Sequence, residues 1–162
     1  MQRDIELARE MRMDGVVLGV LREDFAVDVE RTRELVSQAG PMQVTFHRAF
    51  DECRDLLQAM EDVIKTGADR ILTCCAKPGV ACGLSELRAL IRRAGERIIV
   101  VPGGGITPEN FALVQEATGA WEFHSGLGSV LEYGSGDIPS FENAVRELAG
   151  QKKHRSIDRS LQ

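Results

Sequence analysis

The stretch QVTFHRAFD, residues 43–51, indicates both the fold and the place of a functional site. Its first half alternates apolar residues with Thr45 and His47, which is the period-two pattern of a β-strand with one apolar and one polar face. Buried strands of a parallel sheet are usually apolar on both faces, because buried polar groups are costly. We therefore expect the polar face to line a binding or catalytic pocket.

The segment WEFHS, residues 121–125, repeats this alternation. Glu122 and His124 lie two residues apart, so they would share one face of a strand. We predict that they line the same concave surface as Thr45 and His47, at the carboxyl ends of neighbouring strands.

Strand-like runs recur along the chain with even spacing. They begin near residues 15, 43, 70, 97 and 121, so successive starts lie 24 to 28 residues apart, which is room for one strand, one helix and two short loops. Amphipathic stretches between them predict helices over residues 27–38, 54–66, 83–94 and 108–118. Thr107 is the expected N-cap of the last of these, and the glycines that follow the four helices are expected left-handed C-caps. A closing helix is predicted over residues 140–148.

Regular α/β repeats with polar side chains on one strand face favour a (β/α)8 barrel over an open doubly wound sheet. About five strands are visible in 162 residues, whereas a closed barrel has eight strands and about 250 residues. We therefore expect the C-terminal five-eighths of a barrel over residues 1–150, with a basic tail over residues 151–162. Unpaired edges of such a sheet template association, so we also expect a homo-oligomer.

Composition narrows the class of function. A net charge of −5 disfavours nucleic-acid and anionic-membrane surfaces, and no apolar run has the length of a membrane span. The charged N-terminus lacks the apolar core of a signal peptide, and four cysteines without framework spacing suggest a reducing compartment. These features predict a cytoplasmic location.

The glycine-rich stretch PGGGI, residues 102–106, follows a strand and precedes a helix. Gly103, Gly104 and Gly105 would let the backbone approach a ligand and turn its N–H groups toward an anion. In barrels, the loop after the seventh strand often forms part of a phosphate site. The alternative is that these glycines only form a tight turn.

His47 and Arg48 end their strand at the edge where barrel enzymes place chemistry. His47 is a candidate general base or metal ligand, and Arg48 could hold a carboxylate or phosphate with its planar fork. The alternative for His47 is a core histidine with satisfied hydrogen bonds. Asp51 either orients Arg48 through an ion pair or caps the helix that begins near Arg54.

Glu122 and His124 have two functional interpretations. With His47 they could form a two-histidine, one-carboxylate metal site, or they could act as an acid and base in proton transfer. A polar core network without chemistry is the third possibility. The candidate catalytic residues are therefore His47, Arg48, Glu122 and His124. The candidate ligand-binding residues are Thr45, Asp51, Thr73, Gly103, Gly104 and Gly105.

Cysteines offer a weaker alternative site. Cys74 and Cys75 are expected to end a strand and to point to opposite faces, so at most one of them could approach Cys82. Thiolates suit Cu(I), which makes Cys74 and Cys82 weak candidate copper ligands. Free cysteine is more often a small buried apolar residue, and this is the expectation for Cys53.

Five segments in this order resemble the CutC family of copper homeostasis proteins. They are VTFHRAFD (44–51), GADRILT (67–73), GLSELRALI (83–91), RIIVVPGGGIT (97–107) and EFHS (122–125). The resemblance implies a (β/α)8-type barrel, a cytoplasmic location and a proposed role in copper handling. It also implies three further strands upstream of the point where this chain begins.

Three interpretations remain open at this stage. The first is a protein that controls intracellular copper by binding the ion, with Cu(I) as its cargo and no defined enzymatic activity. The second is a barrel enzyme that acts on a small phosphorylated or carboxylated metabolite through His47, His124 and the PGGGI loop. The third is an inactive remnant whose open edge is filled by another chain.

Overall fold

The computed structural model describes residues 1–125, and those residues alternate helices with short parallel strands. The helices are α1 (Gln2–Glu10), α2 (Val29–Ala39), α3 (Leu56–Thr66), α4 (Leu84–Ala94) and α5 (Pro108–Thr118), and the strands are β1 (Gly15–Leu18), β2 (Gln43–Phe46), β3 (Arg70–Thr73) and β4 (Ile99–Pro102). Two 3-10 helices, η1 (Arg48–Glu52) and η2 (Val80–Cys82), follow β2 and β3. The predicted closing helix and the basic tail lie outside the described residues.

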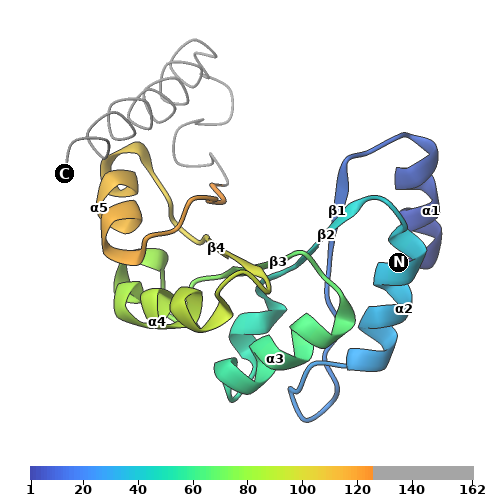
Figure 1. The fold of residues 1–162 in the computed structure, drawn as a ribbon, viewed down its shortest axis with the longest axis horizontal. Coiled ribbons are helices and arrows are strands. Elements are labelled where there is room, and N and C mark those ends of the chain that lie inside the picture. Colours follow the sequence, from blue (N-terminus) through green and yellow to red (C-terminus); the bar gives the residue numbers. More distant parts are fainter. Residues whose placement is uncertain (126–162) are drawn as a thin grey trace.

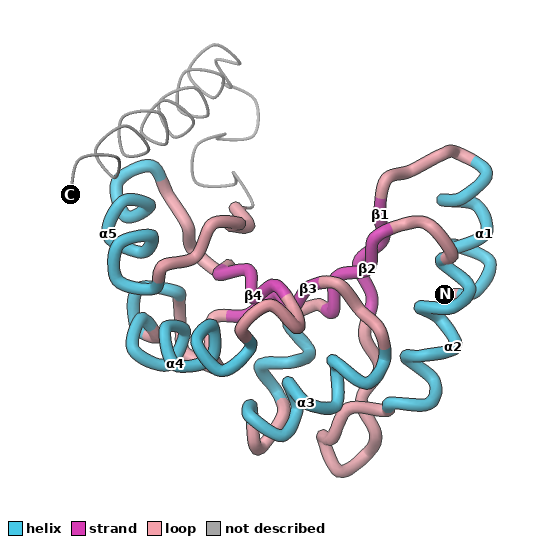
Figure 2. Tube along the Cα trace, viewed as in Figure 1, coloured by secondary structure: helices cyan, strands magenta, loops and turns pink. Residues whose placement is uncertain are grey.

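The four strands form one parallel sheet in the order β1-β2-β3-β4, as successive strands of a barrel do. Figure 1 shows the sheet as a shallow arc with α2, α3 and α4 along its convex side, α1 beside β1 and α5 beside β4. In Figure 2 the concave side of this arc is open, and no described helix lies on it. The chain therefore has the incomplete TIM-barrel architecture that the sequence predicted.

The core lies between the convex face of the sheet and the helices. Parallel pairing places Phe46 beside Ile71 and Ile71 beside Val100, and all three side chains are buried. On the concave face, Val17 is 63% exposed, and Thr45 and Arg70, which pair with each other, are half-buried. Paired residues of a parallel sheet share a face, so this alternation fixes which side chains can reach the concave face.

The expected fifth strand is not formed among residues 1–125. The segment 121–125 contributes a single bridge, between Gly103 and His124, where the His124 N–H donates to the carbonyl of Pro102 (3.0 Å). Continuing this pairing toward Glu122 would need an N–H from Pro102, and proline has none. The described sheet therefore has four strands rather than five.

Helix termini largely follow the local sequence. The Asp55 side chain accepts hydrogen bonds from the N–H groups of Leu57 and Gln58 and so caps α3, and Thr107 caps α5 as predicted. The glycines after α2, α3, α4 and α5 all have positive φ, but only Gly67 and Gly119 adopt the left-handed helical conformation expected of all four. No helix among the described residues is long and apolar enough to cross a membrane.

Candidate functional site

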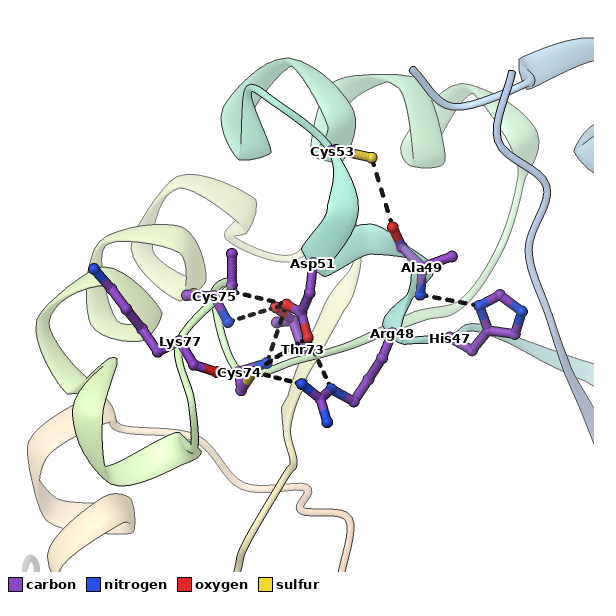
Figure 3. A network of polar contacts seen from close by, with 10 residues as sticks. His47, Arg48, Ala49, Asp51, Cys53, Thr73, Cys74, Cys75 and Lys77 are labelled. Atoms are coloured by element: carbon purple, nitrogen blue, oxygen red, sulfur yellow. Dashed lines mark hydrogen bonds and ion pairs between the residues drawn. The ribbon is translucent and has the colours of Figure 1, made fainter. Parts of the chain in front are cut away.

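Asp51 is the centre of a polar network at the carboxyl ends of β2, β3 and β4. Its side chain is buried, and its carboxylate accepts hydrogen bonds from Arg48 Nε (2.8 Å), from Thr73 Oγ1 and from the N–H groups of Cys74 (3.2 Å) and Ala76 (3.1 Å). Figure 3 shows Arg48, from η1, and Thr73 and Cys74, from the end of β3, around Asp51. Of the two alternatives that the sequence left open, Asp51 orients Arg48, since Asp55 rather than Asp51 caps the following helix.

The protonation state of Asp51 follows from this network. Burial alone would raise the pKa of Asp51, but the hydrogen bonds from Thr73 and Arg48 outweigh it and hold the pKa below its ordinary value. The same hydrogen bond raises the pKa of Arg48 further above its ordinary value. The pair is therefore a fixed carboxylate and a fixed guanidinium at neutral pH.

The turn after β3 is shaped by the same carboxylate. Cys75 and Ala76 have φ values of 58° and 57°, a backbone conformation that residues other than glycine rarely adopt. The Cys75 N–H donates to Thr73 Oγ1 (2.8 Å) and the Ala76 N–H donates to Asp51 Oδ1 (3.1 Å), so both strained residues are held by side chains of the network.

Among the described residues, Arg48 makes hydrogen bonds on one edge only. Its Nε donates to Asp51 (2.8 Å), its Nη2 donates to Cys74 Sγ (2.9 Å), and Nη1 makes no hydrogen bond within residues 1–125. Gly104 lies beside the free edge, since a side-chain carbon built there would be 3.3 Å from Nη1. The Arg48 side chain is 48% exposed, so this edge can meet a ligand.

The PGGGI loop is tied to both neighbouring loops. The Gly103 N–H donates to the carbonyl of Thr73 (3.0 Å), and the carbonyl of Gly104 accepts from the N–H of Val80 (2.9 Å). Asn110 joins the loop to α5, because its side chain donates to the carbonyl of Gly105 (2.7 Å) and accepts from the N–H of Thr107 (3.0 Å). The structure thus brings Gly103 and Gly104 next to the Arg48 network, while Gly105 is exposed.

His47 is half-buried at the end of β2. Its Nδ1 accepts a hydrogen bond from the Ala49 N–H (3.2 Å), so the neutral imidazole carries its proton on Nε2. His124 is exposed beside Gly103, and no hydrogen bond joins the two histidines in the described part of the chain. Thr45 shares the face of His47, because residues two apart in a strand point the same way.

Glu122 has a partner that the sequence did not reveal. It forms a two-point ion pair with Arg70, at 2.5 Å from Nε and 3.2 Å from Nη2, and both side chains are largely buried. Arg70 pairs with Thr45 across the sheet, so the ion pair lies on the concave face. This contact satisfies the Glu122 carboxylate, which therefore differs from the open metal ligand or free acid that spacing suggested.

The Thr73 side chain points to the core face of the sheet, whereas that of His47 points to the concave face. Thr73 lies two residues after Ile71, which is paired with Phe46, and therefore on the opposite face from His47. It is fully buried and serves the Asp51 network from that position.

The cysteines are dispersed. Cys74 is buried against Arg48 and Asp51, Cys75 lies in the core, and Cys82 is exposed on η2. Burial raises the pKa of the Cys74 thiol and raises that of Cys75 to about 12, which keeps both protonated at neutral pH. No group of three or more histidine, cysteine or acidic side chains in residues 1–125 could hold a metal ion.

The chain matches known proteins over most of its length. The model of the CutC family matches residues 1–129. A protein of Chromobacterium violaceum named as a family protein CutC is 42% identical over 165 residues, which cover 99% of this chain and 67% of that protein. A human protein named copper homeostasis protein cutC homolog is 40% identical over 134 residues, which cover 83% of this chain and 49% of the relative.

A solved structure gives the same assignment. The CutC protein of Streptococcus agalactiae superposes with a TM-score of 0.72 at 28% sequence identity, covering 76% of this chain and 60% of that one. The chain thus spans roughly half to two thirds of the length of these relatives. On its sequence and its fold, the chain belongs to the CutC family.

Proposed function

We propose that this chain carries an anion-binding site of a CutC-type barrel, with Arg48 as the residue that holds a phosphate or carboxylate group. The observation behind the proposal is the guanidinium with one edge fixed by Asp51 and Cys74 and the other edge without a hydrogen bond to any described residue. A fork of parallel N–H groups matches the two oxygens of a carboxylate or phosphate, and the carboxyl ends of barrel strands are where such ligands bind.

The distribution of charge supports this proposal. Asp51 is adjacent to Arg48, but its negative charge is shared among backbone N–H groups of Cys74 and Ala76 and the hydroxyl of Thr73. Within residues 1–125, Arg48 donates only to Asp51 and to the uncharged sulfur of Cys74, and half of its side chain faces solvent. A ligand anion would therefore meet the N–H groups of a guanidinium whose carboxylate partner is already occupied by other donors, although the whole chain is acidic.

A small phosphorylated or carboxylated metabolite is the class of ligand that this site fits. In that role, Thr45 and the Nε2–H of His47 would contact the rest of the ligand from the concave face, and Gly103, Gly104 and Gly105 would permit close approach. His47 and His124 are the groups available for proton transfer. Glu122 acts through its ion pair with Arg70, which fixes the segment that carries His124.

A titration with inorganic phosphate at constant ionic strength, followed by calorimetry, tests the proposal. Arg48→Met should abolish binding, and Arg48→Lys should weaken it, because lysine keeps the charge but loses the fork. Arg88→Met, at an exposed site on α4, is the control for loss of one positive charge. Equal phosphate binding by Arg48→Met and Arg88→Met would refute the proposal.

Copper control is the second candidate, and the names of the human and mouse relatives favour it. In this proposal Cu(I) is the cargo and the protein takes part in control of intracellular copper in the cytoplasm. The thiols of the described residues fit such a site poorly, since Cys74 is protonated and bound to its neighbours while Cys82 is exposed. Any Cu(I) bound by this chain should therefore bind weakly.

Competition with a Cu(I) chelator tests the copper proposal. The double variant Cys74→Ser, Cys82→Ser should change the Cu(I) affinity by less than about twofold. A loss of tenfold or more would show that these thiols form a copper site and would favour copper binding over the anion site.

We also propose that the chain forms a homo-oligomer through the outer edge of β1. Within residues 1–125 this edge has no strand partner, and Val17 of β1 is 63% exposed. Unpaired edges and exposed apolar side chains promote association between chains.

A further inference from the structure

The Arg48 guanidinium is held by two different acceptors on the same edge. An arginine side chain has five N–H groups, and those of Nε and Nη2 that point the same way form its side-on edge. Nε donates a hydrogen bond to Asp51 Oδ2 (2.8 Å), and one N–H of Nη2 donates to Cys74 Sγ (2.9 Å). Three N–H groups remain, and two of them, one of Nη1 and the second of Nη2, form the end-on edge.

We infer that Cys74 is a positioning residue, whose sulfur sets the plane of the Arg48 guanidinium and directs its end-on edge toward the ligand. This inference rests on the proposed anion site. With Nε alone fixed by Asp51, the guanidinium could still swing about the Asp51 contact. A second acceptor on the same edge removes that freedom, and pre-organisation of this kind strengthens binding by lowering its entropic cost.

The sulfur is itself held in place from several sides. Its thiol lies 3.2 Å from Asp51 Oδ2 and 3.0 Å from the carbonyl of Lys77, and the Cys74 side chain is fully buried. The backbone of Cys74 is fixed as well, because its N–H donates to Asp51 and its carbonyl packs against Gly83, where a side-chain carbon would lie only 2.7 Å away. The sulfur is therefore a stationary acceptor.

The acceptor is also uncharged, which distinguishes it from a second carboxylate. Burial and the hydrogen bond to Asp51 raise the pKa of the Cys74 thiol, so it stays protonated at neutral pH. It donates its own proton to one of the two neighbouring oxygens and accepts from Arg48. Cys74 thus orients the guanidinium without cancelling the positive charge that an anion requires.

The test compares Cys74→Ser, which keeps an acceptor, with Cys74→Ala, which removes it. Cys53→Ala is the control, because Cys53 is also buried but contacts the carbonyl of Ala49 and not Arg48. The affinity for inorganic phosphate should fall about fivefold in Cys74→Ala, which corresponds to one hydrogen bond. It should stay within about twofold of wild type in Cys74→Ser and Cys53→Ala.

A second readout needs no ligand. In the full chain labelled with 15N-arginine, NMR should resolve separate Nη1 and Nη2 signals for Arg48 in wild type and Cys74→Ser, and averaged signals in Cys74→Ala, since only a held guanidinium rotates slowly. Averaged signals in wild type, or unchanged signals in Cys74→Ala, would overturn the role of Cys74. Should wild type bind no phosphate, the anion site fails, while the NMR result still decides whether Cys74 holds Arg48.

Discussion

Replacement of Asp51 by asparagine should destabilise the protein strongly, because this change removes the charge while keeping the shape of the side chain. Three donors depend on that charge: the buried hydroxyl of Thr73, the buried N–H of Cys74 and the partly buried N–H of Ala76. A hydrogen bond to a charged group stabilises a protein by about 1 kcal/mol more than a neutral hydrogen bond does. Loss of the charge should therefore lower the free energy of unfolding by about 3 kcal/mol through these three hydrogen bonds. The ion pair with Arg48 adds little, since that side chain is 48% exposed.

The expected loss corresponds to a fall of roughly 6–12 °C in melting temperature for a chain of this size. Urea and thermal unfolding of Asp51→Asn measure it, and Asp24→Asn is the matched control. Asp24 is exposed and accepts from the N–H of Ala26 and from exposed Arg22, so its replacement should cost less than about 0.5 kcal/mol. A decrease of less than about 1 kcal/mol in the free energy of unfolding of Asp51→Asn would refute the conclusion that Asp51 is the centre of the polar network.

The dependence of stability on pH in the acidic range gives an independent check on the role of Asp51. The pKa of Asp51 is lower in the folded chain than its ordinary value, so its contribution is complete above that ordinary value, about 3.9, and is lost as the pH falls toward the folded value. Asp51→Asn should therefore flatten the dependence of stability on pH below about pH 4.

Three further results are expected. Burial raises the pKa of Cys75 to about 12, so between about pH 9 and pH 12 this thiol should lower the stability by about 1.4 kcal/mol per pH unit. Cys75→Ala should reduce the slope of alkaline unfolding curves by this amount and keep the part that comes from other buried thiols such as Cys53; an identical slope in the variant would contradict the assignment. Gly83→Ala should lower the free energy of unfolding by about 1–3 kcal/mol, because the added carbon would lie 2.7 Å from the carbonyl oxygen of Cys74. Gly79→Ala should be nearly neutral in the same unfolding measurements, because its added carbon would lie 3.5 Å from the nearest atom, the carbonyl oxygen of Gly104. Val17→Lys should shift size-exclusion profiles toward monomer, and a wild-type chain that is already monomeric would exclude association through β1.

The sequence predicts the elements well because hydrophobic periodicity is a local property. The helix over residues 108–118 is found as predicted, and α2, α3 and α4 begin within two residues of their predicted starts. The spacing of three between Arg48 and Asp51 also allowed their ion pair to be anticipated, since these residues lie on one turn.

Contacts between distant residues could not be predicted in this way. The pairing of Glu122 with Arg70 joins positions 52 residues apart and depends on the register between strands, which periodicity does not supply. The sequence contained one indication of this ion pair, because Arg70 occupies a position on the polar face of its strand. The face to which Thr73 points also depends on the register of β3 to β2, which the alternation within one strand does not supply.

The turn at Cys74 was the least predictable part of the site. Local propensity disfavours positive φ at Cys75 and Ala76, so the sequence indicated a strand that continues through the cysteines. Asp51, more than twenty residues earlier, stabilises the turn instead. Tertiary contacts overrode local preference at the place where the proposed ligand site lies, as is common at functional sites.

Parallel calorimetric titrations of the wild-type chain and of Arg48→Met with inorganic phosphate test the central claim most directly. The account predicts saturable binding by wild type, none by Arg48→Met, and normal binding by Arg88→Met. Absence of phosphate binding by wild type, together with tight Cu(I) binding that disappears in Cys74→Ser, Cys82→Ser, would contradict it.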